Sequence, residues 1–533
     1  MSKTLPNILI VVIDCARSDA WLGPGRRVQT PSVDRLAAEG FSLPVTITEK
    51  ACTTPAFTTL LSGQYSPRHG VHQVWGYRVR ETTPLLTHDL AAAGYNTYAE
   101  TSGPLLAETG LDRAFARFEY RAPCDYLHTA WGERFVQRLK SGHYRAPWLI
   151  MLHTWELHGP RQVLPAFDAP AFGRDPYERA VSSLDAQLRR VFDAAGDDAL
   201  IVLTGDHGEK TAREVYREDS AVAYARRRLG LDRVEGMPPH HLAQWAGPSV
   251  LHQFCEEFNA ELRDTRVDQI GQRGESWWTR ACDRLRLLYV TPWVYLHDLL
   301  ALGKPLRLTE MLRRRGLLDR GRSRAALERM RRAVGHDVRR DMHRRMWLNS
   351  YKNNMIEGHM VGVYDFLVRV PLVLRWRGRL PAGRVSERMV RQPDILPTVI
   401  DLVLGREPSQ SGDLDGRSVR GLLDGGALAE APAFVSVTGI PAELEVHGVR
   451  TETHKYTYGP YNPELPEELY DLRHDPGETL NVAGREPELC LHLRETAQRL
   501  ASTAGQAEAA EPALAAADRA HVERHLRELG YIE

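Results

Sequence analysis

The sequence predicts an α/β protein in which a largely parallel sheet is sandwiched between helices. Short, continuously apolar runs alternate with helix-like stretches, and several of these runs end in polar clusters. Continuous apolar runs are typical of parallel strands that are buried on both faces. In such folds, ligands bind beyond the carboxyl ends of the strands, so the polar clusters mark a candidate site.

Each element follows from its own pattern. The predicted strands of the sheet are 8–13, 96–99, 148–153, 199–204 and 370–376. Between them, stretches such as PSVDRLAAEGF and LLTHDLAAAGY have helical spacing and end at a glycine, which is a common helix stop. The polar residues that follow the strands are Asp14, His153, His158, Asp206 and His207.

Two segments depart from this pattern. Residues 211–350 lack strand signals and are rich in arginine at helical spacing, so we predict a helical insertion between two halves of a core, 1–210 and 351–425. Residues 426–533 are predicted to form a small C-terminal subdomain, with strands at 433–438, 447–451 and 455–458 and a helical tail. The insertion has three interpretations: a solvated surface, a lid over the site, or a surface that docks on anionic lipid or an acidic substrate.

Composition narrows the class of protein. The 533 residues contain 69 basic and 69 acidic side chains, so bulk charge predicts no nucleic-acid partner. The six cysteines form no CxxC pair, which favours reduced thiols. The apolar run at the N-terminus is short for a signal peptide, and no clean membrane span follows. We therefore expect a cytoplasmic protein; the sequence indicates no oligomeric state.

The stretch ACTTPAFTTLLSG contains three candidate nucleophiles, Cys52, Thr53 and Thr54. Thr54 before Pro55 resembles an N-cap and a first helical position, which would put Thr53 just ahead of a helix N-terminus, where anions are favoured. Asp14, Asp206 and His207 offer three of the four ligands that a divalent metal needs. Thr53 would be the fourth, because a bound cation can activate a hydroxyl that is otherwise inert.

Beyond these residues, the chain resembles the sulfatase branch of the alkaline-phosphatase superfamily. The motifs that carry the resemblance are PNILIVVIDCARSD, TTPAFTTLLSGQYSPRHGV, LAAAGYNTY, HTWELHGP, LTGDHGE, YDFLVRVPLVL, QPDILPTVIDLVLG and LYDLRHDPGETLN. The resemblance implies an α/β/α core with a small C-terminal sheet and a metal-assisted attack on a phosphoryl or sulfuryl centre. It also implies that Asp14, Asp206 and His207 bind the metal, that Thr53 is both ligand and nucleophile, and that His158 and His359 contact the transferred group or protonate the leaving group.

The sequence also departs from the family. Sulfatases that are converted to formylglycine carry C-x-P-x-R, whereas here Thr53 occupies the nucleophile position and Phe57 the arginine position, so we expect no formylglycine. Their second metal-site amide is replaced by His207, and an imidazole favours Mn²⁺ or Zn²⁺ over Ca²⁺.

These observations predict a metal-dependent hydrolase or transferase that cleaves a small anionic phosphate, phosphonate or sulfate ester through a covalent intermediate on Thr53. Two alternatives remain open: a true sulfuric ester hydrolase that uses threonine, and a non-catalytic descendant that binds an anion.

Overall fold

The computed structural model describes residues 5–74, 77–159, 161–211, 359, 362–438, 445–461, 467–478, 480–502, 518, 521, 522, 524 and 525. By its internal contacts the chain divides into two units, one made of residues 1–211 and 357–529 and the other of residues 212–356 and 530–533. The predicted helical insertion lies outside the described residues, so its structure and its three suggested roles stay predictions.

The core of the first unit is an eight-stranded sheet in the order β10-β2-β9-β7-β1-β6-β4-β5. Its strands are β1 (Ile8–Ile13), β2 (Phe41–Ser42), β4 (Asn96–Thr101), β5 (Arg117–Tyr120), β6 (Trp148–Thr154), β7 (Leu200–Gly205), β9 (Leu372–Arg375) and β10 (Arg384–Val385). β1 lies in the middle, parallel to both β6 and β7, and all six of its residues are buried. The continuous apolar run of β1 is therefore explained by burial on two faces.

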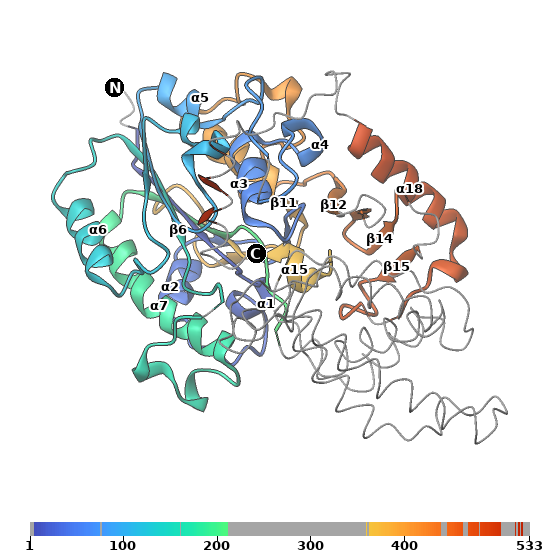
Figure 1. Ribbon diagram of the computed structural model, residues 1–533, viewed down its shortest axis with the longest axis horizontal. Coiled ribbons are helices and arrows are strands. Elements are labelled where there is room, and N and C mark those ends of the chain that lie inside the picture. Colours follow the sequence, from blue (N-terminus) through green and yellow to red (C-terminus); the bar gives the residue numbers. More distant parts are fainter. Residues whose placement is uncertain are drawn as a thin grey trace, which may run out of the picture. The chain divides into compact units, whose positions relative to one another are not determined.

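Helices cover both faces of this sheet (Figure 1). Ile8, Ile10 and Val12 of β1 pack in one core cluster with residues of α3 (Thr53–Ser62), α5 (Thr87–Ala92) and α16 (Ile395–Leu404). The alternate residues of β1 pack in a second cluster with residues of α2 (Pro31–Ala38), α6 (Ala130–Lys140) and α7 (Pro176–Ala195). The predicted α/β/α sandwich is confirmed.

Most strands lie where the sequence predicts them, but the run at 370–376 does not form one strand. Pro371 separates β8 (Arg369–Val370), which belongs to a three-stranded sheet with β3 (Thr46–Ile47) and β11 (Val390–Arg391), from β9 in the large sheet. β9 runs antiparallel to β7, so the expectation of a parallel strand was wrong there. Proline has no backbone N–H to continue the ladder, which explains the break.

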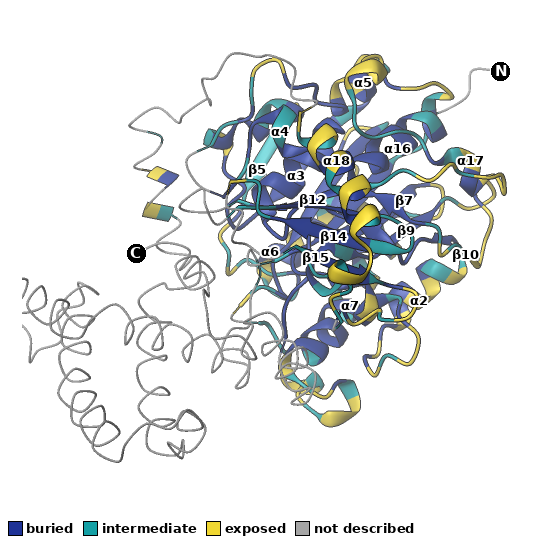
Figure 2. Cartoon of the chain, turned by 90° about the vertical axis from the view of Figure 1, so that its right-hand side faces the viewer, coloured by how far each residue is buried: buried dark blue, intermediate teal, exposed yellow. Residues whose placement is uncertain are grey.

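The C-terminal part of the chain contains the small sheet that was predicted. The sheet is antiparallel with four strands, β12 (Ala433–Val437), β13 (Val446–Arg450), β14 (His454–Tyr458) and β15 (Glu468–Asp471), of which the sequence indicates three and not β15. Helix α18 (Pro487–Ser502) buries Leu493 and Ala497 against Val449 and Tyr456 of this sheet, and its outer side is exposed (Figure 2). Among the described residues, the remaining α-helices are short: α1 (Ser18–Trp21), α4 (Ser66–His69), α15 (Asp365–Val368) and α17 (Arg420–Leu423).

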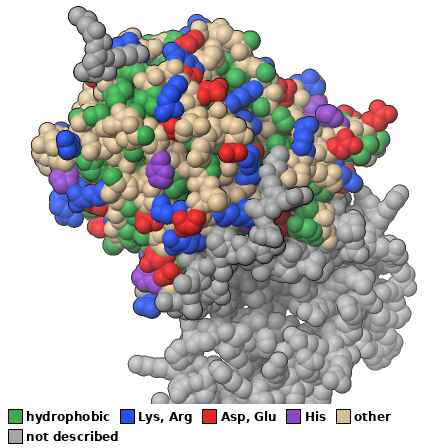
Figure 3. Space-filling model, turned by 90° about the horizontal axis from the view of Figure 1, so that it is seen from above, with side chains coloured by type: hydrophobic (Ala, Val, Ile, Leu, Met, Phe, Trp, Pro, Cys, Tyr) green, Lys and Arg blue, Asp and Glu red, His purple; other side chains and the backbone are tan. Residues whose placement is uncertain are grey.

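On the described part of the surface seen in Figure 3, basic and acidic side chains are interspersed. Among the described residues, no helix combines the length and the apolar character that crossing a bilayer requires.

Candidate functional site

The site begins where two neighbouring strands end. β1 is in register with β7, so that Ile13 lies beside Gly205, and the next residues, Asp14 and Asp206, emerge together at the carboxyl edge of the sheet. The amide of Asp14 donates to the carbonyl of Thr154 on β6 at 3.0 Å, and that of Asp206 donates to Ile13 at 3.4 Å. Both carboxylates are fully buried.

The turn after β7 is fixed by close contacts. Gly208 donates its N–H to Leu367 at 2.7 Å, and a Cβ at this position would lie 2.1 Å from the carbonyl oxygen of Phe366. Only glycine fits so close to another backbone. From the other side, the Gln392 amide donates to the carbonyls of Gly205 and Asp206 at 3.3 and 3.0 Å. These contacts hold Asp206 and His207 in place.

Helix α3 begins at Thr53, with Cys52 as the N-cap residue, so the expectation that Thr54 caps this helix was wrong. Pro55 is the third helical residue rather than the first. A proline is tolerated there because the N–H groups of the first turn have no partner within the helix. Thr53 therefore belongs to the first turn itself, and the helix ends at Gly63, which is in the left-handed conformation.

The hydroxyl of Thr53 reaches the strand-end cluster. Its Oγ1 lies 3.2 Å from Oδ2 of Asp14 and 3.3 Å from Nε2 of His207. One ligand atom each from Asp14, Asp206 and His207 lie within 4.8 Å of one another. The structure thus brings together all four residues that the sequence suggests as metal ligands.

The donor set fits a divalent cation. Oδ2 of Asp206 is buried, lies 3.5 Å from Nε2 of His207 and accepts no hydrogen bond from the described residues. Burial, and then the charge of Asp14, raise the pKa of Asp206 well above its usual value. A cation between these groups would supply the missing partner and offset two buried negative charges.

The ring of His207 is oriented for ligation. Its Nδ1 lies 2.8 Å from the carbonyl oxygen of Gly208, which can only accept a hydrogen bond, so Nδ1 carries the proton. Nε2 is then an acceptor directed at Thr53 and Asp206. Burial, ahead of the charge of His359, lowers the pKa of His207 to about 3, so the ring is neutral at neutral pH. A neutral imidazole whose other nitrogen is tied to a carbonyl is the usual state of a metal-binding histidine.

His359 and His158 lie beside this cluster. The ring of His359 is 4.3 Å from that of His207 and 5.3 Å from that of His158, which stacks on Trp155 at 4.0 Å. Burial opposes the charged form of His359, but its interaction with Glu209, 3.6 Å from Nδ1, raises its pKa. Glu209, which follows the Asp206–His207 turn, thus interacts with His359.

Two polar residues near the cluster, Cys15 and His153, had no assigned role. Cys15 directly follows Asp14, and its Sγ is 2.7 Å from Oδ1 of that residue and 3.6 Å from Nδ1 of His359. His153 is fully buried, with Nε2 3.5 Å from Oδ2 of Asp14, and Phe57 packs edge-on against its ring at 4.9 Å. In the sequence, the clue to Cys15 and His153 was their position at the end of a predicted strand. That position alone does not assign a chemical role to a side chain.

Cys52 is a poor nucleophile in this setting. Burial raises the pKa of its thiol to about 12, so the thiolate that would react is scarce at neutral pH. Thr53, one residue later, is the nucleophile candidate that lies in the cluster.

Comparison with known proteins supports the same family. Residues 6–247 match the model of the family "Sulfatase", and residues 361–503 match "N-sulphoglucosamine sulphohydrolase, C-terminal". Human arylsulfatase D is 37% identical over 103 residues, which are 19% of this chain and 16% of that protein. N-acetylglucosamine-6-O-sulfatase of Bacteroides thetaiotaomicron is 29% identical over 151 residues, 27% of this chain and 26% of that protein. These alignments span about a quarter or less of each relative.

Solved structures share the fold. The phosphonate monoester hydrolase of Agrobacterium radiobacter has a TM-score of 0.55 at 18% identity, over 93% of this chain and 95% of that one. A protein solved with its substrate D-glucosamine-2-N,6-O-disulfate has a TM-score of 0.56 at 14% identity, over 95% of this chain and all of that one. The solved structures thus share the fold of this chain. The two sulfatase-family models, which together match residues 6–247 and 361–503, identify the chain as a member of the sulfatase family.

Proposed function

We propose that the protein is a metal-dependent hydrolase or transferase that cleaves a phosphate or phosphonate ester by attack of Thr53. The observation that carries this proposal is the position of the Thr53 hydroxyl, 3.2 Å from Asp14 and 3.3 Å from His207, at the start of a ten-residue helix. Asp14, Thr53, Asp206 and His207 would hold the cation. A bound Mn²⁺ or Zn²⁺ lowers the pKa of a coordinated hydroxyl and offsets charge on the transferred group.

The residues of the chain have separate tasks in this reaction. Oγ1 of Thr53 gives up its proton, for which Oδ2 of Asp14 is the nearby acceptor, and forms a bond to phosphorus while the bond from phosphorus to the ester oxygen breaks. The N-terminus of α3 favours the negative charge of the group being transferred. His158 contacts that group, and His359, whose pKa is raised by its interaction with Glu209, supplies the proton that the leaving oxygen takes up. Water, or an acceptor alcohol, then releases the group from Thr53.

The choice of phosphorus over sulfur rests on the chemistry of the nucleophile. Formylglycine can expel sulfate through its geminal diol, and an unmodified threonine has no such route. The tests are parallel assays of bis-nitrophenyl phosphate and nitrophenyl sulfate with added Mn²⁺. Preferential hydrolysis of the phosphate ester supports the proposal, and hydrolysis of the sulfate ester alone would refute it.

A sulfuric ester hydrolase that uses threonine is the second candidate. The names of the two curated relatives favour it, since both are sulfatases. A non-catalytic descendant is the third, and metal analysis separates it from both enzymes: a chain purified without metal, and unable to take up Mn²⁺ or Zn²⁺, would be neither enzyme.

A further inference from the structure

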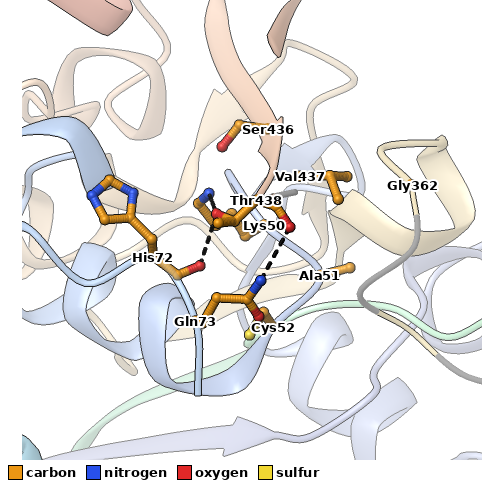
Figure 4. Close-up of a pocket in the computed structure, with 9 residues that line it drawn as sticks. All are labelled: Lys50, Ala51, Cys52, His72, Gln73, Gly362, Ser436, Val437 and Thr438. Carbon is orange, nitrogen blue, oxygen red and sulfur yellow. Dashed lines mark hydrogen bonds between the residues drawn. The ribbon is translucent and has the colours of Figure 1, made fainter. Parts of the chain in front are cut away.

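A polar pocket adjoins the start of α3, where Cys52 is the N-cap residue (Figure 4). It is lined by Lys50, Ala51, Cys52, His72, Gln73, Gly362, Ser436, Val437 and Thr438. Cys52 immediately precedes Thr53, and its thiol is near enough to the cluster for the charges of Asp206 and Asp14 to act on it. The pocket is therefore next to the proposed reaction centre.

Lys50 is the unusual member of this lining. It is only 3% exposed, and its Nζ donates one hydrogen bond, of 2.6 Å, to the hydroxyl of Thr438. The nearest carboxylate oxygen, on Glu49, is 3.9 Å away, at the limit of an ion pair. An ammonium group has three donors, so among the described residues Lys50 keeps donors for a ligand.

Glu49 is already engaged elsewhere. Its carboxylate accepts hydrogen bonds from the amide of Ser66 at 2.6 Å, from the hydroxyl of the same residue and from the hydroxyl of Ser436 at 3.0 Å. Glu49 therefore offsets part of the charge of Lys50 but forms no hydrogen bond with the Lys50 ammonium group. Burying a cation that lacks a hydrogen-bonded counter-charge is costly, and an anionic ligand in the pocket would offset this cost.

The other side chains of the lining carry no charge at neutral pH. Burial lowers the pKa of His72 to about 3, and the Cys52 thiol is protonated as well. Gln73 is held by a 3.0 Å hydrogen bond from its amide nitrogen to the carbonyl of Thr438. The formal charge that the lining presents to a ligand is thus the positive charge of Lys50.

We propose that this pocket binds a second anionic group, such as a carboxylate, on the organic part of the substrate, with Lys50 as its main partner. The inference rests on the proposed function and extends it: the substrate would be a phosphate or phosphonate ester that carries a further negative charge. Gln73 and Thr438 would position that group through the hydrogen bonds that frame Lys50.

The test is calorimetric and needs no turnover. The Mn²⁺-loaded protein is titrated with 3-phosphonopropionate and 4-phosphonobutyrate, and with alkylphosphonates of matched length, which carry the phosphonate but no carboxylate. At least one carboxylate is expected to bind about tenfold more tightly than its alkyl match, as one charge-assisted hydrogen bond allows. Lys50→Met should reduce this ratio to about one, and Lys50→Arg should keep part of it. Lys140→Met, on the exposed surface of α6, is the matched control and should keep the full ratio.

The outcomes are distinct. If neither carboxylate shows an advantage, or if the advantage persists in Lys50→Met, the pocket does not bind an anion and the inference is overturned while the proposed function stands. An equal loss of affinity for both ligand types in Lys50→Met would assign Lys50 a structural role, which also overturns it. If the alkylphosphonates fail to bind to the Mn²⁺-loaded wild-type protein, the proposed function itself fails.

Discussion

Substitution of Lys455 by methionine should strongly destabilise the protein. Lys455, on β14, is 1% exposed, and its Nζ lies 2.5 Å from Oδ1 of Asp365 and 2.7 Å from Oε1 of Glu478. Arg450, 3.2 Å from the other oxygen of Asp365, would still compensate that carboxylate in the variant. Glu478 would be left buried without a cation. Breaking a buried ion pair from one side costs about 3–5 kcal/mol.

The pH dependence identifies the cause of this loss. Burial, ahead of the opposing effect of Lys455, raises the pKa of Glu478 to about 7, and removing Lys455 should raise it further. A carboxyl group whose pKa is higher in the folded than in the unfolded protein stabilises the fold at low pH. That stability is lost as the pH rises from about 4.5 to the folded-state pKa. The free energy of unfolding of Lys455→Met should therefore fall by up to about 1.4 kcal/mol per pH unit between pH 6 and 8.

Denaturant unfolding followed by circular dichroism measures both effects. Adding Glu478→Gln removes the orphaned charge, so the double variant should recover more than half of the loss and show a flatter pH profile. Lys140→Met controls for the loss of a lysine and should stay within about 0.5 kcal/mol of the wild type. A cost below about 1 kcal/mol for Lys455→Met, or a double variant no more stable than the single one, would refute this reasoning.

Three further predictions concern the site and the core. Thr53→Ala should lower kcat on bis-nitrophenyl phosphate on the order of 10³-fold or more while metal analysis still finds bound Mn²⁺; an active variant would exclude Thr53 as the nucleophile. Chelation should abolish hydrolysis, and Mn²⁺ or Zn²⁺ should restore more of it than Ca²⁺ in the same assay. Burial holds the pKa of His69 well below 6.5, with its ring between the amide of Val71 and the hydroxyl of Thr59. The folded state then binds fewer protons than the unfolded state, so acidification below pH 6.5 should destabilise the wild type more than His69→Gln, by up to about 1.4 kcal/mol per pH unit. Urea unfolding of both proteins over this pH range measures the difference. Parallel plots of unfolding free energy against pH would contradict this prediction.

Much of the sheet was predictable because its strands are buried on both faces. The continuous apolar run of β1 needs no knowledge of its neighbours to be recognised, and the register of β1 with β7 then places Asp14 beside Asp206. Convergence of these carboxylates thus follows from parallel pairing alone. The sequence could not show which sheet each half of the 370–376 run joins, because that depends on β3 and on β7, which are distant along the chain.

The start of α3 was mispredicted for a related reason. A threonine before proline satisfies the local pattern of a capped helix, but the hydroxyl of Thr54 is buried with no hydrogen-bond partner among the described residues. The hydroxyl of Thr53 instead meets Asp14, 39 residues away, and His207, 154 residues away. Capping rules describe residues that are neighbours in sequence. They cannot predict the start of a helix whose first residue contacts side chains that follow two distant strands.

The backbone around the cluster is likewise held from a distance. Cys15 has a φ of 57°, a left-handed conformation that costs a non-glycine residue roughly 1–2 kcal/mol. Tyr177 of α7 fixes this turn: its hydroxyl donates to the carbonyl of Cys15 at 2.7 Å and accepts from the amide of Arg17 at 3.0 Å. Gln392 does the same for the turn that carries Asp206. Helix α7 therefore holds the strained turn after Asp14 from one face of the sheet. The carboxylate of Asp14 is thereby directed towards Thr53, as the proposed reaction at the threonine hydroxyl requires.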